Sequence, residues 1–250
     1  MTLRLGWFTA GRGPGSRGMF ERALAAIDDG SLDAEIAFVF MHRERGEGEG
    51  SDGFIDLAAS RSIPVIALSS QRFRRMHDGD FANHREEYDA QALALLHEHA
   101  ADVCVLAGYL LILSPMLVDA YRFVNLHPAL PDGPVGLWQK VIWELIHANA
   151  DETGNMMLIV TNDLDRGPQL TYNRVPIKGG GFDTLWAGPR KPGSEEDPLF
   201  NAIRAAAVLR EPVLLVETLK ALTMGDLRLD TPPSVPLDLT HAVEAALEAP

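Results

Sequence analysis

The chain alternates short apolar runs with longer segments in which apolar positions recur at helical spacing. Short runs of this kind are typical of strands that are buried on both faces of a sheet. They predict strands at Leu3–Phe8, Ala34–Phe40, Pro64–Leu68, Val103–Ala107 and Phe123–Leu126. Helical spacing predicts helices at about Met19–Ile27, Asn83–Ala100 and Gly136–Asn149. Because strands alternate with helices, we expect an α/β fold: a Rossmann-like, mostly parallel open sheet with helices on both faces.

The second half of the chain continues with two strands, which we place at Met156–Thr161 and Gln169–Ile177. A last helical region, about Leu199–Leu222, closes the fold. Pro212 lies inside it, and proline removes one helical hydrogen bond, so we expect a break or kink there. The pattern therefore predicts elements up to about residue 225.

Two segments without apolar periodicity are predicted to be surface loops, Arg43–Gly53 and Lys178–Pro198. The tail from Asp226 has three prolines before a short amphipathic segment, and we expect it to be a peripheral appendage. The predicted organisation is a single domain over residues 1–225, with a nucleotide-binding half at about 1–107, a catalytic half at about 108–225 and a peripheral tail at 226–250.

Composition narrows the function classes. The chain has 22 basic and 35 acidic residues and a formal net charge of −13, which disfavours nucleic acids and anionic membranes as partners. Its longest apolar run, Val103–Leu113, is too short to span a bilayer. Cys104 is the single cysteine, so no disulfide can form within the chain. We expect a cytoplasmic protein that binds an anion, if at all, at one local site.

A glycine-rich loop, Gly11–Gly18, joins the first strand to the first helix and contains Arg12 and Arg17. Glycines allow tight turns, and a helix N-terminus offers free N–H groups to an anion, although a plain strand-to-helix turn would look similar. A dinucleotide site would need an acidic residue at the end of the second strand, where the chain has Phe40–Arg43. The loop therefore favours a phosphate site without a dinucleotide.

The segment Phe123–Pro128 carries a second candidate site. Asn125 and His127 are two residues apart, so on an extended strand both side chains point to one face. An amide donor beside an imidazole suits acyl transfer, which needs a group for the developing oxyanion and a group that moves a proton. A turn-capping asparagine and a structural histidine are the alternative.

The third candidate is the loop Thr161–Pro168, which follows a strand and contains Asp163 and Asp165. A carboxylate there could pair with His127 and stabilise its protonated form. The alternative is an ordinary Asx turn. The remaining histidines stand alone without ligand spacing, among them His77, His84 and His97, and we expect no metal site.

In this order, the segments resemble the phosphoribosylglycinamide formyltransferase family, which uses 10-formyltetrahydrofolate. The likeness runs from about Leu3 to Leu229. Val105–Pro115 resembles the family's L-A-G-[FY]-x-x-I-L-S-P segment, Asn125–Pro128 its N-x-H-P strand, and Val160–Pro168 its V-x-x-x-x-D-x-G-P loop. The order and spacing of the three motifs carry the resemblance.

The resemblance implies formyl transfer from 10-formyltetrahydrofolate to a primary amine, by default 5-phosphoribosylglycinamide in purine biosynthesis. It assigns catalysis to Asn125, which steadies the tetrahedral intermediate, to His127, which relays protons, and to Asp165, which keeps His127 protonated. The implied folate site comprises Arg85, Tyr109, Leu110, Leu111, Ile112, Leu113, Asn125, Thr161, Asn162, Asp163, Leu164 and Asp165. The expected phosphorylated-amine site comprises Gly13, Gly15, Ser16, Arg17 and Arg204. A homodimer is one assembly that the sequence allows.

The chain departs from the family pattern at several positions, and the departures leave alternatives open. The residues concerned are Leu111, Ala129, the altered loop Pro131–Gly136, Leu158 and Ala207. Ala207 occupies the position at which an ungapped comparison expects a glutamate that contacts the amine substrate. One alternative is therefore a formyltransferase for another amine, such as an amino sugar nucleotide. The other is a non-catalytic relative that binds folate or a nucleotide.

Overall fold

The structure is a computed structural model that describes residues 2–248, and its centre is one open sheet in the order β3-β2-β1-β4-β5-β6-β7-β8. The strands are β1 (Leu3–Thr9), β2 (Ala34–Met41), β3 (Val65–Ala67), β4 (Val103–Leu106), β5 (Phe123–His127), β6 (Glu152–Ile159), β7 (Gln169–Pro176) and β8 (Leu237–Asp238). The helices are α1 (Pro14–Asp28), α2 (Glu49–Ser60), α3 (Ser70–Met76), α4 (Arg85–Leu96), α5 (Pro115–Ala120), α6 (Trp138–His147), α7 (Gly181–Ala187), α8 (Pro198–Met224) and α9 (Thr240–Glu248).

The pairing of the strands confirms the expected fold class. Strands β1 to β5 are parallel, β6 is antiparallel to β5 and to β7, and β8 is parallel to β7. Strand order reverses where β1 lies between β2 and β4, because the chain moves outward from β1 to β3 and then returns to place β4 on the other side. Ligands of open α/β sheets bind at such a switch point, beyond the carboxyl ends of the strands.

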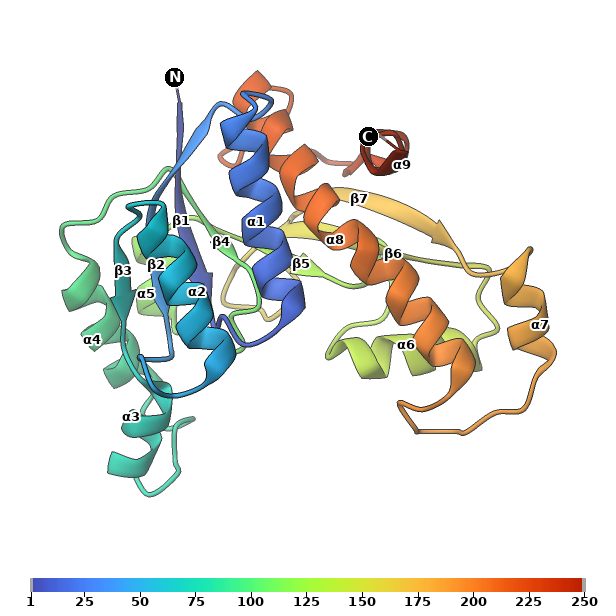
Figure 1. Ribbon diagram of the computed structural model, residues 1–250, viewed down its shortest axis with the longest axis horizontal. Coiled ribbons are helices and arrows are strands. Elements are labelled where there is room, and N and C mark those ends of the chain that lie inside the picture. Colours follow the sequence, from blue (N-terminus) through green and yellow to red (C-terminus); the bar gives the residue numbers. More distant parts are fainter. Residues whose placement is uncertain (1, 249–250) are drawn as a thin grey trace.

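Helices cover both faces of the sheet (Figure 1). On one face, α1, α2 and α8 pack on residues such as Trp7 and Val105, which are buried in the largest apolar cluster. On the other face, α3, α4 and α5 enclose an aromatic cluster around Phe8, whose ring contacts those of Phe38 and Phe123. Two-sided burial explains why these strands are almost continuously apolar.

Both segments lie mostly at the surface, as expected, but each contains helical residues, so the expectation of loops without regular structure is wrong. The segment 43–53 includes the first turn of α2, which Glu49 and Asp52 favour because acidic groups stabilise a helix N-terminus. The segment 178–198 includes α7, whose Trp186 packs against a third apolar cluster formed by α6 and α8. In both segments tertiary packing provides the stability that the local pattern does not indicate.

The expected break in the last helix is also absent, because α8 continues through Pro212 from Pro198 to Met224. Residues 213–216 directly after the proline are all buried against the sheet. Their burial stabilises the helix by more than the roughly 3 kcal/mol that an interior proline costs.

The expectation of a peripheral tail needs correction. Strand β8 pairs with β7, and the backbone N–H of Arg174 donates to the hydroxyl of Thr240 at 2.9 Å. Val243 of α9 is fully buried in the largest apolar cluster, and Glu244 forms an ion pair with Arg210 of α8. The tail thus completes the sheet, because its few apolar side chains cover the edge next to β7. Within residues 2–248, no helix is long and apolar enough to cross a membrane.

Candidate active site

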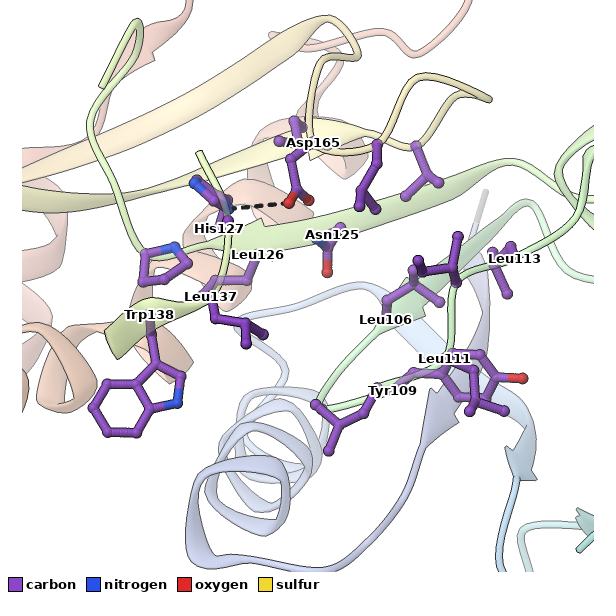
Figure 2. A pocket seen from close by; sticks show the side chains of 18 of the residues that line it. Leu106, Tyr109, Leu111, Leu113, Asn125, Leu126, His127, Leu137, Trp138 and Asp165 are labelled. Atoms are coloured by element: carbon purple, nitrogen blue, oxygen red, sulfur yellow. Dashed lines mark ion pairs between the residues drawn. The ribbon is translucent and has the colours of Figure 1, made fainter. Parts of the chain in front are cut away.

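A cavity of about 640 Å³ lies at the carboxyl ends of β4 and β5, beside the N-terminus of α1 (Figure 2). Four predicted segments meet in its wall. They are the glycine loop with Gly15 and Ser16, the segment Tyr109–Leu113, the end of β5, and the loop after β6. The topology therefore brings together the four regions that the sequence marked separately.

Asn125 and His127 project from β5 into this cavity, as their two-residue spacing predicts. His127 is 2% exposed, and its Nε2 lies 3.0 Å from the carbonyl oxygen of Pro134. Its Nδ1 lies 3.8 Å from Oδ2 of Asp165, the ion pair drawn in Figure 2. Both ring nitrogens therefore face acceptors.

Asp165 reaches His127 from the loop between β6 and β7. Its φ of 54° lies in the left-handed region, which aspartate tolerates better than most residues, and which is often occupied at functional sites. Gly167 fixes the return of the loop: a Cβ at this position would lie 1.7 Å from the carbonyl oxygen of Ile159. The D-x-G pair thus aims a carboxylate at the imidazole and closes the turn behind it.

The wall opposite His127 comes from residues 109–113. Leu110 and Ile112 line the cavity and are 67% and 45% exposed, so this wall presents apolar surface to the cavity. Within residues 2–248, no backbone hydrogen bond joins residues 110–113 to another segment. The hydroxyl of Tyr109 is buried without a partner. This wall offers an apolar surface edged by free donors and acceptors.

The N-terminus of α1 forms the floor next to β4. Its N-cap Gly13 offers no side-chain hydrogen bond, and no acidic residue stands in the first turn. Gly108 allows the close approach, because a Cβ there would lie 2.8 Å from Cβ of Ser16, and its φ of 70° suits glycine. The first turn of α1, with Gly15 and Ser16, therefore borders the cavity without a competing acidic side chain, as an anion site requires.

Four predicted site residues are absent from the cavity wall. Arg17 turns outward to pair with Glu21 at 2.8 Å, because an i, i+4 partner lies on the same helix face. Gly13, the N-cap of α1, does not line the cavity, and Asp163 is exposed. Arg85 instead lines a small neighbouring pocket with Asn83, Glu86 and Ser114, because α4 lies behind the segment 109–113.

A functional candidate that the sequence analysis missed lies on α8. Glu211 is 5% exposed, lines the cavity and pairs with Arg204, which also lines it, at 2.6 Å. The guanidinium of Arg204 lies 4.6 Å from the ring centroid of Trp138. Ala207 is buried one helical turn before Glu211, so the cavity contains an acidic group although position 207 has none. An allowance for a four-residue shift along the helix would have found Glu211.

The structure shows where the remaining departures from the family pattern lie relative to the cavity. Leu111 and Leu158 line the cavity, and Leu158 is the partner of Asn125 in the pairing of β5 with β6. Ala129 is buried two residues after the end of β5. The altered loop at 131–136 supplies the Pro134 carbonyl that faces His127. These changes make the cavity more apolar but leave Asn125, His127 and Asp165 together.

The family can now be assigned, since residues 13–184 match the sequence profile described as formyl transferase. The chain belongs to the formyl transferase family. Over 153 residues it is 36% identical to phosphoribosylglycinamide formyltransferase of Escherichia coli, a match that covers 54% of this chain and 71% of that relative. It is also 31% identical over 163 residues to methionyl-tRNA formyltransferase of Janthinobacterium, covering 62% of this chain and 47% of that one.

Solved structures agree with this fold. Glycinamide ribonucleotide transformylase 1 from Symbiobacterium toebii matches with a TM-score of 0.69 at 19% identity, and the match covers 95% of both chains. The extent of this match includes most of the C-terminal region that the sequence profile does not reach. The resemblance inferred from the three motifs is thus confirmed at the level of the family and of the fold.

Proposed function

We propose that this formyl transferase family member moves a formyl group from 10-formyltetrahydrofolate to the primary amine of 5-phosphoribosylglycinamide, a step of purine biosynthesis. The observation that carries the proposal is the convergence of Asn125, His127 and Asp165 on one cavity wall. An oxyanion donor, a proton carrier and a carboxylate that orients the carrier are the groups that acyl transfer between nitrogens requires.

The wall at residues 109–113 suits the formyl donor. A pterin is a flat ring system with hydrogen-bond donors and acceptors along its edges. The exposed side chains of Leu110 and Ile112 provide apolar surface, and the free backbone groups of the same segment provide polar partners. Such sites combine an apolar lining with a few placed polar groups. Arg85 lies in the adjoining pocket, where it can meet an anionic tail that extends past Ser114.

The opposite side of the cavity suits a phosphorylated amine. The phosphate would bind at the N-terminus of α1 near Gly15 and Ser16, where N–H groups and the helix dipole favour an anion. The buried carboxylate of Glu211 would attract the amine end of the same molecule. Arg204 neutralises this carboxylate and limits the cost of burying it.

Each side chain then has a defined role. The Asn125 amide donates a hydrogen bond to the formyl oxygen as the amine adds and negative charge develops there. His127 donates a proton to the folate nitrogen as the bond between that nitrogen and the formyl carbon breaks, and it takes up the proton that the attacking amine loses. During these transfers a substrate atom replaces the Pro134 carbonyl as the partner of Nε2. Asp165 holds the ring in orientation. None of these roles requires a metal ion.

The test is a turnover assay with purified protein, 10-formyltetrahydrofolate and 5-phosphoribosylglycinamide. We expect turnover by the intact chain and a loss in kcat of about 10²–10⁴-fold in His127→Ala. His147→Ala, which removes an exposed histidine at the end of α6, is the matched control and is expected to keep full activity. An intact protein that binds both ligands without turnover would support the non-catalytic alternative instead.

Acceptor screening addresses the remaining alternative. The case for another amine, such as an amino sugar nucleotide, rested on Ala207, and Glu211 removes that reason. A tRNA acceptor, as the name of the Janthinobacterium relative indicates for that protein, is disfavoured here by the net charge of −13. Turnover of an amino sugar nucleotide but not of 5-phosphoribosylglycinamide would overturn the assignment of the acceptor and keep formyl transfer.

A further inference from the structure

Two histidines and one glutamate meet at the junction of α3 and α4, outside the lining of the cavity. His77 directly follows α3, His84 directly precedes α4, and Glu87 stands in the first turn of α4. One ligand atom from each of the three lies within 4.8 Å of the other two. The histidines are seven residues apart in the chain, so only the turn between the helices brings them together.

The turn holds the three groups in place. Asp78 and Gly79 have φ values of 52° and 90°, which reverse the chain, and Gly79 N–H donates to the carbonyl of Arg74 at 2.8 Å. The ring of His77 lies against those of Phe73 and His84, with centroid distances of 4.3 and 4.1 Å. The two imidazoles are therefore held by packing rather than displayed on a mobile surface.

The hydrogen bonds select ligand-competent forms of the side chains. Nδ1 of His84 lies 2.9 Å from the carbonyl oxygen of Asp80, and a carbonyl only accepts, so the proton stays on Nδ1 and the lone pair on Nε2. Metal-binding histidines usually have such a backbone partner on the other nitrogen. Nε2 of His77 lies 3.6 Å from Oε1 of Glu87, so one ion placed between these two atoms could bind both of them.

We propose that His77, His84 and Glu87 bind one divalent transition-metal ion of the Zn²⁺ class, with water completing the coordination. Two imidazoles and a carboxylate suit Zn²⁺ and not Mg²⁺ or Ca²⁺, which prefer oxygen ligands. The ion would join the end of α3 to the start of α4. Asp89, in the next turn of α4, accepts from the N–H of Ser114 at 2.6 Å, so the site would also steady the end of the segment 109–113.

The test uses the full chain after treatment with a chelator and dialysis. Zn²⁺ titrated into it in a calorimeter should bind with one ion per chain, and Co²⁺ should develop the visible absorption of a four-coordinate site. Mg²⁺ should produce neither effect. A wild-type protein that binds no Zn²⁺, or only several weak ions, overturns the proposal.

Variants locate the ion. His84→Ala should weaken Zn²⁺ binding by about 100-fold or more, since even partners outside the ligand set contribute 10–100-fold. Glu87→Gln changes an exposed side chain, so it tests the site without removing buried packing. The control is His97→Ala: His97 also lies 3.6 Å from a glutamate, Glu98, but this pair has no third ligand. Unchanged affinity in His84→Ala and Glu87→Gln, or an equal loss in His97→Ala, overturns the proposal.

Discussion

His127 receives its orientation from two different parts of the chain. Pro134 approaches Nε2 from the loop after the catalytic strand, and Asp165 approaches Nδ1 from the loop after β6. Both partners are acceptors, and of the two only Asp165 is an acidic side chain. Charge and shape can be separated by an isosteric substitution.

We expect Asp165→Asn to lower kcat for formyl transfer by about 10²-fold or more, because the amide removes the negative charge while it keeps the hydrogen-bonding shape. Asparagine also tolerates the positive φ at this position, so the loop should keep its conformation. Steady-state kinetics with both substrates measure the effect. Asp163→Asn is the matched control in the same loop, and an equal loss in both variants would contradict the role given to Asp165.

His42, at the end of β2, gives a second prediction at this scale. Burial, followed by the charge of Arg43, lowers the pKa of His42 to about 4 from its ordinary 6.5. His42 therefore binds a proton below about pH 6.5 in the unfolded chain, but only below about pH 4 in the folded protein. The contribution of neutral His42 to the free energy of unfolding is fully present above pH 6.5. About 3 kcal/mol of this contribution is lost as the pH falls to 4.

We accordingly expect His42→Gln to flatten the fall in the free energy of unfolding between pH 6.5 and 4. Urea unfolding at several pH values measures the slope, which is compared between variants because the substitution also removes the contact with Ser70 at 3.0 Å. His147→Gln, at an exposed position, should keep the wild-type slope. If the slope is the same in His42→Gln, another group controls acid unfolding.

Site residues could be predicted from the sequence where the local spacing of residues determines which way their side chains point. Asn125 and His127 share a strand face because they are two apart, and the D-x-G motif located Asp165. Glu211 was missed because an ungapped comparison placed the family's glutamate at Ala207. A four-residue shift on a helix keeps the same face, so the carboxylate still reaches the cavity. Arg17 and Arg85 lie outside the cavity wall, because the orientation of these long side chains depends on partners that the sequence does not specify.

At the scale of elements, the start of α8 depends on one buried carboxylate. Asp197 is fully buried and accepts hydrogen bonds from the backbone N–H groups of Leu199, Phe200 and Lys191 at 2.9, 3.1 and 2.7 Å. Burial acts to raise the pKa of Asp197, but these donors outweigh it and the pKa is lowered. The residue is thus an N-cap that also ties the segment before α8 to the helix.

We expect Asp197→Ala to lower the free energy of unfolding by about 2 kcal/mol, at the upper end for an N-cap because three buried donors lose their acceptor. Asp197→Asn keeps a capping oxygen and should cost less. Glu196→Ala is the control, because Glu196 is exposed and pairs only with Lys191. Urea unfolding ranks the variants, and equal stability of Asp197→Ala and Glu196→Ala would contradict the capping role.

Elements with strong local patterns were predicted, and those that depend on packing were not. The strands β1 to β5 are apolar because both faces are covered, which leaves a clear pattern in the sequence. Helix α7 has no fully buried residue, and its apolar side chains are only partly buried where they pack against the cluster around Phe200. The uninterrupted course of α8 through Pro212 likewise depends on tertiary burial, which a local rule does not include.

For the whole molecule, the sheet order decides where chemistry can occur. The sequence predicted an open parallel sheet, and its switch point explains why the glycine loop, residues 109–113 and β5 share one cavity. The far edge of the sheet was not predictable. Its last strand, β8, is two residues long and pairs with a strand more than 60 residues earlier, so no local pattern indicates it.

The last prediction concerns this edge. Removal of the chain after Gly225 would uncover the outer edge of β7 and the surfaces now covered by Leu227 and Val243. Burial of an aliphatic side chain contributes about 1.5–3 kcal/mol, so we expect a loss of at least about 3 kcal/mol in the free energy of unfolding. An uncovered edge strand also pairs with other chains, so size-exclusion chromatography should show aggregates.

Point variants distinguish the loss of buried apolar side chains from the exposure of the β7 edge. Val243→Ala should cost about 2 kcal/mol in urea unfolding without aggregation, because it leaves β8 paired with β7. Val235→Ala, at an exposed position of the same tail, should leave the unfolding curve unchanged. A truncated chain that unfolds at the wild-type urea concentration would show that residues 226–248 lie on the sheet without stabilising it. Because β8 and α9 contact β7 and α8 rather than the cavity, the truncated protein that remains folded should keep its affinity for folate.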